Sequence, residues 1–412
     1  MVYIAAALVL VFSLAAVLIS SDSVSAQPRY YVSTTGSDTT GDGSEGNPWR
    51  TIGYAIGPAS DGDTIIVASG IYNENDLNVG ESMRIQGAGM GSTIVDAQYG
   101  GRVFSIGACD FELSGMTIRN GNTSANGGGI YNQGTLTITD CTVSGNMAGF
   151  DGGGIYNDEY STLNMTNCTI SGNYALYSGG GIYNEGGEVT MTNCTISGNT
   201  AACGGGIHNE GGEVTMTNCT ISGNTTGGRG GGIYTITPAQ TTVILNYCTI
   251  TNNTAVYGGG GIYNYDDLVK LNCTIVYGNT FDDNIDGNID GDSEYEIDLC
   301  SIVGGADVRL GPLQNNGGPT DTHALLTGSP AIDTCDCGCS VDTDQRGLPR
   351  PVDGDLDGAA VYDVGAYEKQ PAVGGTIEPV DKIGILAPWL GLAAFIVMAM
   401  VVLVVIKRRR LA

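Results

Sequence analysis

Apolar and polar positions alternate over short runs through the middle of the chain, and the alternation slips phase wherever a glycine or an asparagine occurs. In one unit the apolar positions are Ile182, then Val189 and Met191, then Cys194 and Ile196. Alternation with a period of two is typical of a strand with one buried face. The pattern therefore predicts three short strands joined by tight turns in each unit.

The unit is repeated along the chain. Its motif is GGGIYN at 127–132, 152–157, 179–184 and 259–264, with GGGIHN at 204–209 and GGGIYT at 230–235. The spacing of 25 to 29 residues indicates a solenoid. Leucine-rich repeats share this period, but they need a leucine ladder and a helix or 3₁₀ segment, whereas these units are rich in β-formers. An all-β parallel β-helix therefore fits the repeats better.

Stacked coils place equivalent residues of successive units ~4.8 Å apart, so each position of the unit becomes a ladder along the axis. The isoleucines of the motif are expected to form an inner apolar row: Ile130, Ile155, Ile182, Ile207, Ile233 and Ile262. The asparagines that end the same strand are expected to pass amide hydrogen bonds from coil to coil. They are Asn132, Asn157, Asn184, Asn209 and Asn264.

A cysteine also recurs at one position of the unit, at Cys141, Cys168, Cys194, Cys219, Cys248 and Cys273. In-register parallel side chains keep their Cβ atoms ~4.8 Å apart, outside the usual disulfide range of ~3.5–4.5 Å. A free cysteine packs well as a small hydrophobic residue. We therefore expect packed, reduced thiols rather than disulfides or a metal site.

An aromatic row follows the isoleucines by one residue, at Tyr131, Tyr156, Tyr183, His208, Tyr234 and Tyr263. Because neighbouring residues of a strand face opposite sides, this row should point outward if the isoleucines point inward. Exposed aromatic rings on a rigid face suit sugar rings, so these six residues are candidate ligand-binding residues. The alternative is that the rings stack on one another and stabilise the coils.

The GGGIYN units and the TNCTISGN-like strands that follow them resemble the repeats of polymorphic outer membrane proteins, which carry GGA[IL] and FxxN motifs. The resemblance covers roughly 120–280 and implies a right-handed parallel β-helix of the pectin-lyase-like superfamily, with three-strand coils of about 26 residues. The opening segments YYVSTTGSDTTGDGSEGNPWRTIGYAI at 30–56 and GDTIIVASGIYNE at 62–74 are similar to the start of many secreted β-helices.

Residues 310–368 carry a second resemblance. The segments LGPLQNNGGPTDTHALLTGSPAID, DTDQRGLPRP and DVGAYE are similar to the marks of choice-of-anchor Q domains. Such domains follow β-helical repeats and precede varied C-terminal anchors on prokaryotic surface proteins. The resemblance implies surface display and no particular catalysis.

The two ends of the chain predict export and anchoring. Residues 4–19 form an apolar run before the small residues VSA at 24–26, so we expect cleavage after Ala26, with an uncleaved anchor as the alternative. Residues 385–406 are 22 residues without a charge, enough to cross ~30 Å of hydrocarbon as a helix, with a buried soluble helix as the alternative. The basic tail at 407–412 predicts that the bulk of the chain lies outside the cell.

The net charge of −27, from 43 acidic and 16 basic residues, excludes nucleic acid as an expected partner. Between residues 121 and 280 the only basic residues are Arg229 and Lys270. The middle of the chain therefore lacks the cationic subsites that a polyanionic polysaccharide needs. Neutral glycans, cell-wall material and divalent cations remain as partners.

Enzymes with this fold use clustered aspartates with calcium and an arginine base, or paired aspartates with a following His-Gly. This chain has only His208 and His323, and no pair of aspartates recurs on adjacent repeat strands. The sequence therefore indicates no acid–base dyad, and we assign no catalytic residue. A polysaccharide-active lyase or hydrolase is kept as the alternative function.

Two acidic stretches match the first half of a calcium-binding loop: Asp353, Asp355 and Asp357, and Asp286, Asn288 and Asp290. Both lack the glutamate at position twelve of the loop, where Val364 and Ile297 stand instead. Calcium is the one candidate cofactor, and a solvated turn is the alternative at each stretch.

Three more cysteines, Cys335, Cys337 and Cys339, lie too close together to pair comfortably with one another. Cys300 is one distant partner for them in an oxidising exterior. A metal cluster is the other option, although no nearby histidine would contribute to it.

The sequence as a whole predicts a rod of roughly nine coils. We expect it to be displayed at the cell surface, anchored in the cytoplasmic membrane, with a structural, adhesive or glycan-binding role. The expected segments are a signal peptide at 1–26, the β-helix at 27–305 with clear repeats at 121–280, a choice-of-anchor Q-like domain at 306–368, a linker at 369–384, one transmembrane helix at 385–406 and a cytoplasmic tail at 407–412.

Overall fold

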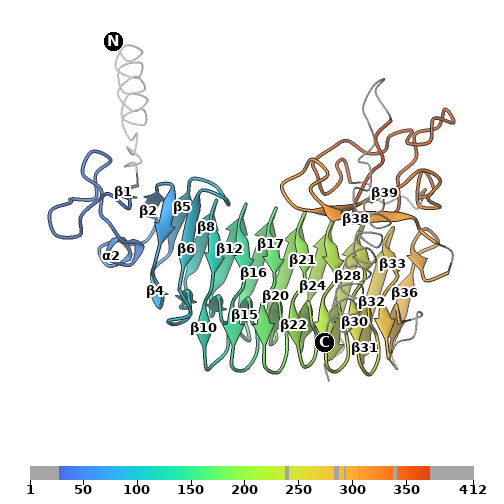
Figure 1. The fold of residues 1–412 in the computed structure, drawn as a ribbon, viewed down its shortest axis with the longest axis horizontal. Coiled ribbons are helices and arrows are strands. Elements are labelled where there is room, and N and C mark those ends of the chain that lie inside the picture. Colours follow the sequence, from blue (N-terminus) through green and yellow to red (C-terminus); the bar gives the residue numbers. More distant parts are fainter. Residues whose placement is uncertain are drawn as a thin grey trace, which may run out of the picture.

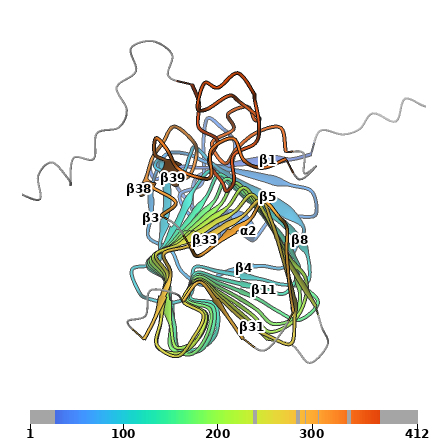
Figure 2. The same ribbon diagram turned by 90° about the vertical axis from the view of Figure 1, so that its right-hand side faces the viewer.

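The structure is a computed structural model, and it describes residues 27–236, 241–282, 287–291, 294–305, 307–336 and 341–371. These residues form a parallel β-helix, in which long parallel sheets run along one axis (Figure 1, Figure 2). The predicted signal peptide, transmembrane helix and basic tail lie outside the described residues, as does most of the predicted linker. In the part of the chain that the structure describes, no helix is both long enough and apolar enough to cross a membrane.

In each repeat the glycines are followed by a strand of sheet 1 and then by a strand of sheet 2. Sheet 1 contains the isoleucines of the motif, and its described strands are β4 (Leu77–Val79), β7 (Phe104–Ile106), β11 (Ile130–Asn132), β15 (Ile155–Asn157), β19 (Ile182–Asn184), β23 (Ile207–Asn209), β27 (Ile233–Ile236), β31 (Ile262–Tyr265) and β35 (Ile289–Asp290). Sheet 2 follows, with β1 (Arg29–Val32), β2 (Thr64–Val67), β5 (Met83–Gly87), β8 (Asp110–Ser114), β12 (Thr135–Thr139), β16 (Thr162–Thr166), β20 (Glu188–Thr192), β24 (Val214–Thr217), β28 (Thr242–Asn246), β32 (Leu268–Asn272) and β36 (Tyr295–Ile297).

Two further sheets follow, of which sheet 4 has seven described strands and is absent from the first coils. Sheet 3 contains β3 (Gly70–Tyr72), β6 (Thr93–Asp96), β9 (Thr117–Arg119), β13 (Thr142–Ser144), β17 (Thr169–Ser171), β21 (Thr195–Ser197), β25 (Thr220–Ser222), β29 (Thr249–Thr251), β33 (Ile275–Tyr277) and β37 (Ile302–Val303). Sheet 4 contains the two-residue strands β10 (Asn122–Thr123), β14 (Met147–Ala148), β18 (Tyr174–Ala175), β22 (Thr200–Ala201), β26 (Thr225–Thr226), β30 (Thr254–Ala255) and β34 (Thr280–Phe281).

The prediction of three strands in each coil is wrong, because the strands of sheet 4 add a fourth strand to most coils. Five of these strands have one exposed and one buried residue, as in Tyr174, which is exposed, and Ala175, which is buried. A two-residue strand is too short to show a period of two, so the alternation could not reveal it. The number of coils is as expected, since the described part of sheet 1 contributes nine strands, one for each coil.

The ladders are in register. Ile130 pairs with Ile155, and Ile155 pairs with Ile182, so the isoleucines form a fully buried inner row. At the end of the same strands the Asn157 amide donates to the Asn184 oxygen at 2.8 Å. A second asparagine ladder, which the sequence reasoning did not single out, runs through the SGN segments, where the Asn173 amide donates to the Asn199 oxygen at 3.0 Å. These buried amides satisfy one another from coil to coil.

The glycine triplet is required by close backbone contacts at the corner between sheet 4 and sheet 1. Gly152 has φ +67°, which favours glycine. A Cβ atom on Gly153 would lie 2.4 Å from the carbonyl oxygen of Tyr174 and 2.5 Å from that of Gly180. No side chain fits there, because the backbones of the next coil occupy the space.

The cysteine ladder is confirmed for its first five members. Cys141, Cys168, Cys194, Cys219 and Cys248 are buried and unbridged. The sixth, Cys273, differs, because it forms a disulfide with Cys335. The expectation of a reduced thiol at Cys273 is therefore wrong. Thr249 pairs with Ile275, so Cys273 lies in register with Tyr247 rather than with Cys248. Thr274 takes the ladder position, where its hydroxyl accepts the N–H of Cys248 at 3.1 Å, and Cys273 joins the second apolar core instead.

Residues beyond the coils pack on the β-helix itself. The antiparallel strands β38 (Leu310–Gln314) and β39 (Thr322–Leu325) lie beside sheet 3 near the C-terminal end of the helix (Figure 1). Ser222 of β25 hydrogen-bonds His323 at 2.9 Å, and the hydroxyl of Thr249 accepts the N–H of Ala366 at 3.0 Å. A second apolar core joins Tyr247 and Ile275 of the coils to Val308, Ile332 and Val364 of the C-terminal segment. The short helix α2 (Ile52–Ile56) buries Ile52 and Ala55 at the other end.

Candidate functional site

The aromatic row of sheet 1 is stacked, but it is not exposed. The ring centroids of Tyr156 and Tyr183 are 5.1 Å apart, and those of Tyr183 and His208 are 4.9 Å apart. Tyr131 is half-buried, and the other five members are between 5% and 9% exposed: Tyr156, Tyr183, His208, Tyr234 and Tyr263. The expected outward row of solvent-exposed rings is therefore wrong, because in-register stacking covers the ring faces. The structure favours the packing alternative for these rings.

A row of acidic residues lies beside the tyrosines. Asp158, Glu185 and Glu210 each follow the last residue of a sheet 1 strand, and their backbone N–H groups donate to equivalent carbonyls of the preceding coils. Each carboxylate accepts a hydrogen bond from a tyrosine hydroxyl of the preceding coil: Tyr131 to Asp158 at 3.0 Å, Tyr156 to Glu185 at 2.6 Å, and Tyr183 to Glu210.

This acidic row was missed by the sequence reasoning, which sought pairs of aspartates on the strands themselves. The signal was the residue after each motif, which reads Gln133, Asp158, Glu185 and Glu210 in successive coils. The absence of a recurring aspartate pair on the strands therefore did not reveal this row. The row mixes Asp with Glu and lies just beyond the strand ends.

Two neighbouring carboxyls of the row have pKa values that are pushed apart. Burial raises the pKa of Glu185 above its ordinary value, and the nearby Asp158 raises it further. For Asp158, hydrogen bonds from Gln133 and Glu185 outweigh the effect of burial and lower the pKa. Burial, together with the hydrogen bond to Asp158, raises the pKa of Tyr131 to about 12. Carboxyls with opposite shifts can hold one shared proton, which is the arrangement that acid–base chemistry uses.

His208 interrupts the row of tyrosines and is electrically neutral. Its side chain is only 5% exposed, and burial lowers its pKa to about 3. Its Nδ1 atom is buried without a hydrogen-bond partner. A neutral ring with the size of an aromatic side chain continues the stack between Tyr183 and Tyr234.

One cation accompanies the row at its N-terminal end. The Arg102 guanidinium lies 5.0 Å from the centre of the Tyr131 ring and donates to the carbonyls of Gly127 and Asn126. These contacts hold the guanidinium in place on the first stacked ring. The site can therefore offer hydroxyls, carboxyls and, at this end, one fixed cation, but only at the edges of the rings.

The first predicted calcium stretch is partly assembled. Oxygen atoms of Asp353 and Asp355 lie within 4.8 Å of one another and of Asp333, which was not among the predicted ligands. Asp357 instead donates its backbone N–H to the carboxylates of Asp353 and Asp355. Asp333 Oδ1 is buried without a hydrogen-bond partner, and burial raises the pKa of this carboxyl. Three carboxylates with one unpartnered oxygen fit the ligand preference of calcium.

The second predicted calcium stretch is used differently. The side-chain oxygen of Asn288 accepts hydrogen bonds from the backbone N–H and the side-chain amide of Asn279, so Asn288 ends the second asparagine ladder. The Asp290 carboxylate accepts the N–H of Gly291. Asp286 lies outside the described residues. The side chain of Asn288 therefore serves the core rather than an open cation loop.

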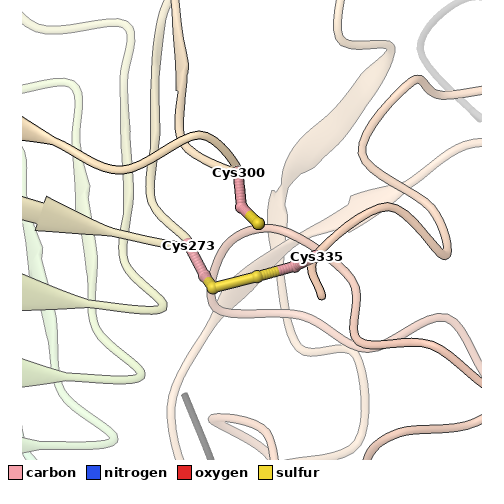
Figure 3. Close-up of side chains that lie close together, drawn as sticks. All are labelled: Cys273, Cys300 and Cys335. Carbon is pink, nitrogen blue, oxygen red and sulfur yellow. A yellow bond between two sulfur atoms is a disulfide. The ribbon is translucent and has the colours of Figure 1, made fainter. Parts of the chain in front are cut away.

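Three cysteines meet where the last coils contact the C-terminal segment (Figure 3). Cys273 and Cys335 form the disulfide, and the sulfur of Cys300 lies within 4.8 Å of both sulfur atoms. Cys300 was expected near the TCDCGC cysteines, and the structure places it there. Cys337 and Cys339 lie outside the described residues.

A groove of about 690 Å³ lies beside α2 and β4, lined by Tyr54, Glu74, Asp76 and Asn78 among others. Burial raises the pKa of Glu74. Both of its oxygens, however, accept backbone N–H groups, those of Ile52 and Gly53, at 2.8 Å. Glu74 therefore stabilises the first turn of α2, and both of its carboxylate oxygens are used in doing so.

Comparison with protein families assigns the fold to a family. The family described as the right handed beta helix region matches residues 59–212 and 126–302. The two matches together span more than half of the chain, so the chain belongs to this family. The expected right-handed β-helix is thereby confirmed. No curated protein matches the chain.

Solved structures share the architecture at low identity. Pectate lyase Pel9A matches with a TM-score of 0.52 and 12% identity, over 84% of this chain and 98% of that chain. Pectin methylesterase PemA from Erwinia chrysanthemi has a TM-score of 0.38 and 13% identity, over 65% of this chain and 94% of its own. A rhamnogalacturonan lyase has a TM-score of 0.38 and 13% identity, over 73% of this chain and 96% of its own. The match to pectate lyase Pel9A, at 12% identity, shows a common fold and not a common activity.

Proposed function

We propose that the chain is a β-helical rod, displayed at the cell surface and anchored in the membrane, that binds neutral glycans without catalysis. The observation that carries this proposal is the outer face of sheet 2. Between β12 and β24 one outward row in register is uncharged and carries hydroxyl and amide groups: Thr137, Asn164, Thr190 and Thr215. Such rows offer hydrogen-bond donors and acceptors at a regular spacing, which suits the hydroxyl groups of a polysaccharide.

The cations of the repeat region support a neutral rather than an acidic ligand. The Arg229 guanidinium lies 4.9 Å from the centre of the Tyr263 ring, and Lys270 forms an ion pair with Glu296 at 2.8 Å. These are the only two basic residues between 121 and 280, and both already have partners. Uronic-acid polymers would therefore meet a negatively charged rod with no available counter-charge in its described repeats.

A glycan array with the purified full-length chain tests the binding role. We expect retention of neutral polysaccharides and little retention of polygalacturonate. Retention of polygalacturonate alone would contradict the proposal. Display at the surface is tested separately, by protease treatment of intact cells, which should remove the β-helix and leave the C-terminal end in the membrane fraction.

A second candidate function is hydrolysis of a polysaccharide. What favours it is the coupled pair Asp158 and Glu185, since a carboxyl with a raised pKa beside an ionised carboxylate can act as a general acid. The polysaccharides retained on the array should be incubated with the chain and assayed for new reducing ends. Loss of this release in Glu185→Gln, with no loss in the exposed Glu188→Gln, would establish the enzyme.

A further inference from the structure

Apolar side chains are exposed along the edge where sheet 4 turns back into sheet 1. We call Met147, Phe150, Tyr174, Leu176 and Tyr177 the aromatic edge. They are 39%, 49%, 39%, 49% and 51% exposed, respectively. The edge lies along the lower side of the rod in Figure 1, near β10 and β22. Contiguous exposed apolar surface on a folded protein marks an interaction site.

A groove lies within this edge and spans three successive coils. Its volume is about 370 Å³. Met147, Tyr174 and Leu176 supply its apolar side, and Asn122, Thr123 and Ser124 supply polar groups. An apolar wall beside a few hydroxyl and amide groups is the usual composition of a small-ligand site.

The edge is held rigid by the coils beneath it. The rings of Phe150 and Tyr177 are stacked with their centroids 5.6 Å apart. Their backbones are joined as well, since the Tyr177 N–H donates to the Phe150 carbonyl at 3.1 Å and the Leu176 N–H donates to the Ala148 carbonyl at 3.1 Å. Side chains fixed before binding lose little entropy when a ligand arrives.

The absence of charged residues from the groove lining favours a neutral ligand. None of the residues that line it is charged, although the chain as a whole carries a net charge of −27. A cationic partner would gain more from the acidic faces elsewhere, and an anionic one would be repelled. A neutral sugar presents apolar C–H faces and hydroxyl groups, which match the apolar side of the groove with its Tyr174 ring and the amide and hydroxyl groups opposite.

We propose that the aromatic edge binds a neutral polysaccharide chain that lies along the axis of the β-helix. The inference rests on the proposed glycan-binding function and gives it a site. This site is separate from the stacked tyrosines of sheet 1, whose rings are buried. A second copy of the chain is the competing occupant of the edge.

The test compares two variants of the full-length chain, one that changes the aromatic edge and one that changes an exposed tyrosine elsewhere. Phe150→Ser combined with Tyr177→Ser removes the stacked pair, whereas Tyr160→Ser removes a tyrosine that is 91% exposed and lies away from the groove. Binding is measured by affinity electrophoresis in neutral β-glucan and by retention on chitin, with polygalacturonate as the acidic probe. We expect the double variant to bind about tenfold more weakly or worse, since stacked aromatics dominate such contacts, and Tyr160→Ser to bind as the wild type does.

Further measurements separate the outcomes. Tyr177→Trp keeps an aromatic face and should preserve or strengthen binding, so a loss of binding in this folded variant would overturn the proposal. Wild-type binding that the double variant retains would overturn the site but not the function, whereas no wild-type binding to either neutral probe would overturn both. Light scattering that shows a wild-type dimer and a monomeric double variant would assign the edge to self-association instead.

Discussion

The side-chain amide of Gln345 donates a hydrogen bond of 2.8 Å to the hydroxyl of Thr195, 150 residues earlier in the chain. The carbonyl oxygen of the same side chain accepts the hydroxyl of Thr220 at 2.7 Å. Gln345 is fully buried and so bridges two coils of sheet 3 from outside. The segment that resembles a choice-of-anchor domain is therefore fastened to the β-helix by buried polar contacts.

Replacing Gln345 should loosen this attachment. We expect Gln345→Ala to lower the free energy of unfolding by about 1–3 kcal/mol, because buried partners such as Thr220 lose their hydrogen bond. Urea denaturation of the full-length chain measures the change. Gln86→Ala, at an exposed glutamine of β5, is the control and should be close to neutral. Equal stability of the two variants would show that Gln345 contributes nothing to the attachment.

The stacked tyrosines should support the coils. Tyr156→Ser and Tyr183→Ser are each expected to destabilise the protein by about 2–4 kcal/mol, since each removes a buried ring from a stack. Both also remove a hydroxyl that bonds a carboxylate, Glu185 or Glu210. Thermal unfolding followed by circular dichroism measures the effect. If both variants melt like Tyr160→Ser, the stack contributes nothing and a binding role for the row regains support.

The cysteine ladder should resist labelling in the native protein. Burial raises the pKa of the thiols of Cys141, Cys168, Cys194 and Cys219 well above the ordinary value, so reactive thiolate is scarce. Alkylation with and without denaturant, followed by mass spectrometry, distinguishes the two states. We expect labelling of these four only after unfolding, and of Cys273 and Cys335 only after reduction. Rapid native labelling of the four would contradict the packing.

Stability should fall as the pH rises through neutrality. Burial and the charge of Glu368 raise the pKa of Asp363 to about 8. Burial likewise raises the pKa of Glu368 to about 7, although Arg350 lies 3.6 Å away. Because both folded pKa values exceed the unfolded ones, the folded state retains protons that the unfolded state has released above about pH 4. The stabilisation is then present at low pH and is lost as pH rises through the folded values.

Melting temperatures between about pH 5 and pH 9 check this sign. Asp363→Asn mimics the protonated acid and should flatten the decline, whereas Asp355→Asn at the exposed loop should leave the slope unchanged in chelator. A wild-type melting temperature that rises over this range would contradict a protonated Asp363.

Calcium should raise the stability of the C-terminal segment modestly. The carboxylates of Asp333, Asp353 and Asp355 converge, and a ligand that binds only the folded state stabilises it by mass action. Adding calcium after EDTA should raise the melting temperature of the wild type, and Asp333→Asn should lose most of the response. Asp290→Asn serves as the matched control from the second acidic stretch. No response in the wild type would leave the first stretch as a turn.

Much of the β-helix could be predicted from the sequence, because in a solenoid each coil repeats the contacts of the last. Ile130, Ile155 and Ile182 recur at one position, and that recurrence alone dictates an inner ladder. The same reasoning identified the asparagine ladder at Asn157 and Asn184 and the packed cysteines. Periodicity carries this information since burial is decided within one coil and then copied.

Only the tertiary structure decided what covers each outward residue. Tyr156 alternates correctly with Ile155, yet it is buried, because its ring is covered by rings of neighbouring coils and its hydroxyl by Glu185. Alternation within a strand tells which side a residue faces and not what lies on that side. For the same reason it could not reveal that Phe150 and Tyr177, on turns outside the strands, are exposed. The contact between Gln345 and Thr195 joins segments 150 residues apart, and no local pattern encodes such a pairing.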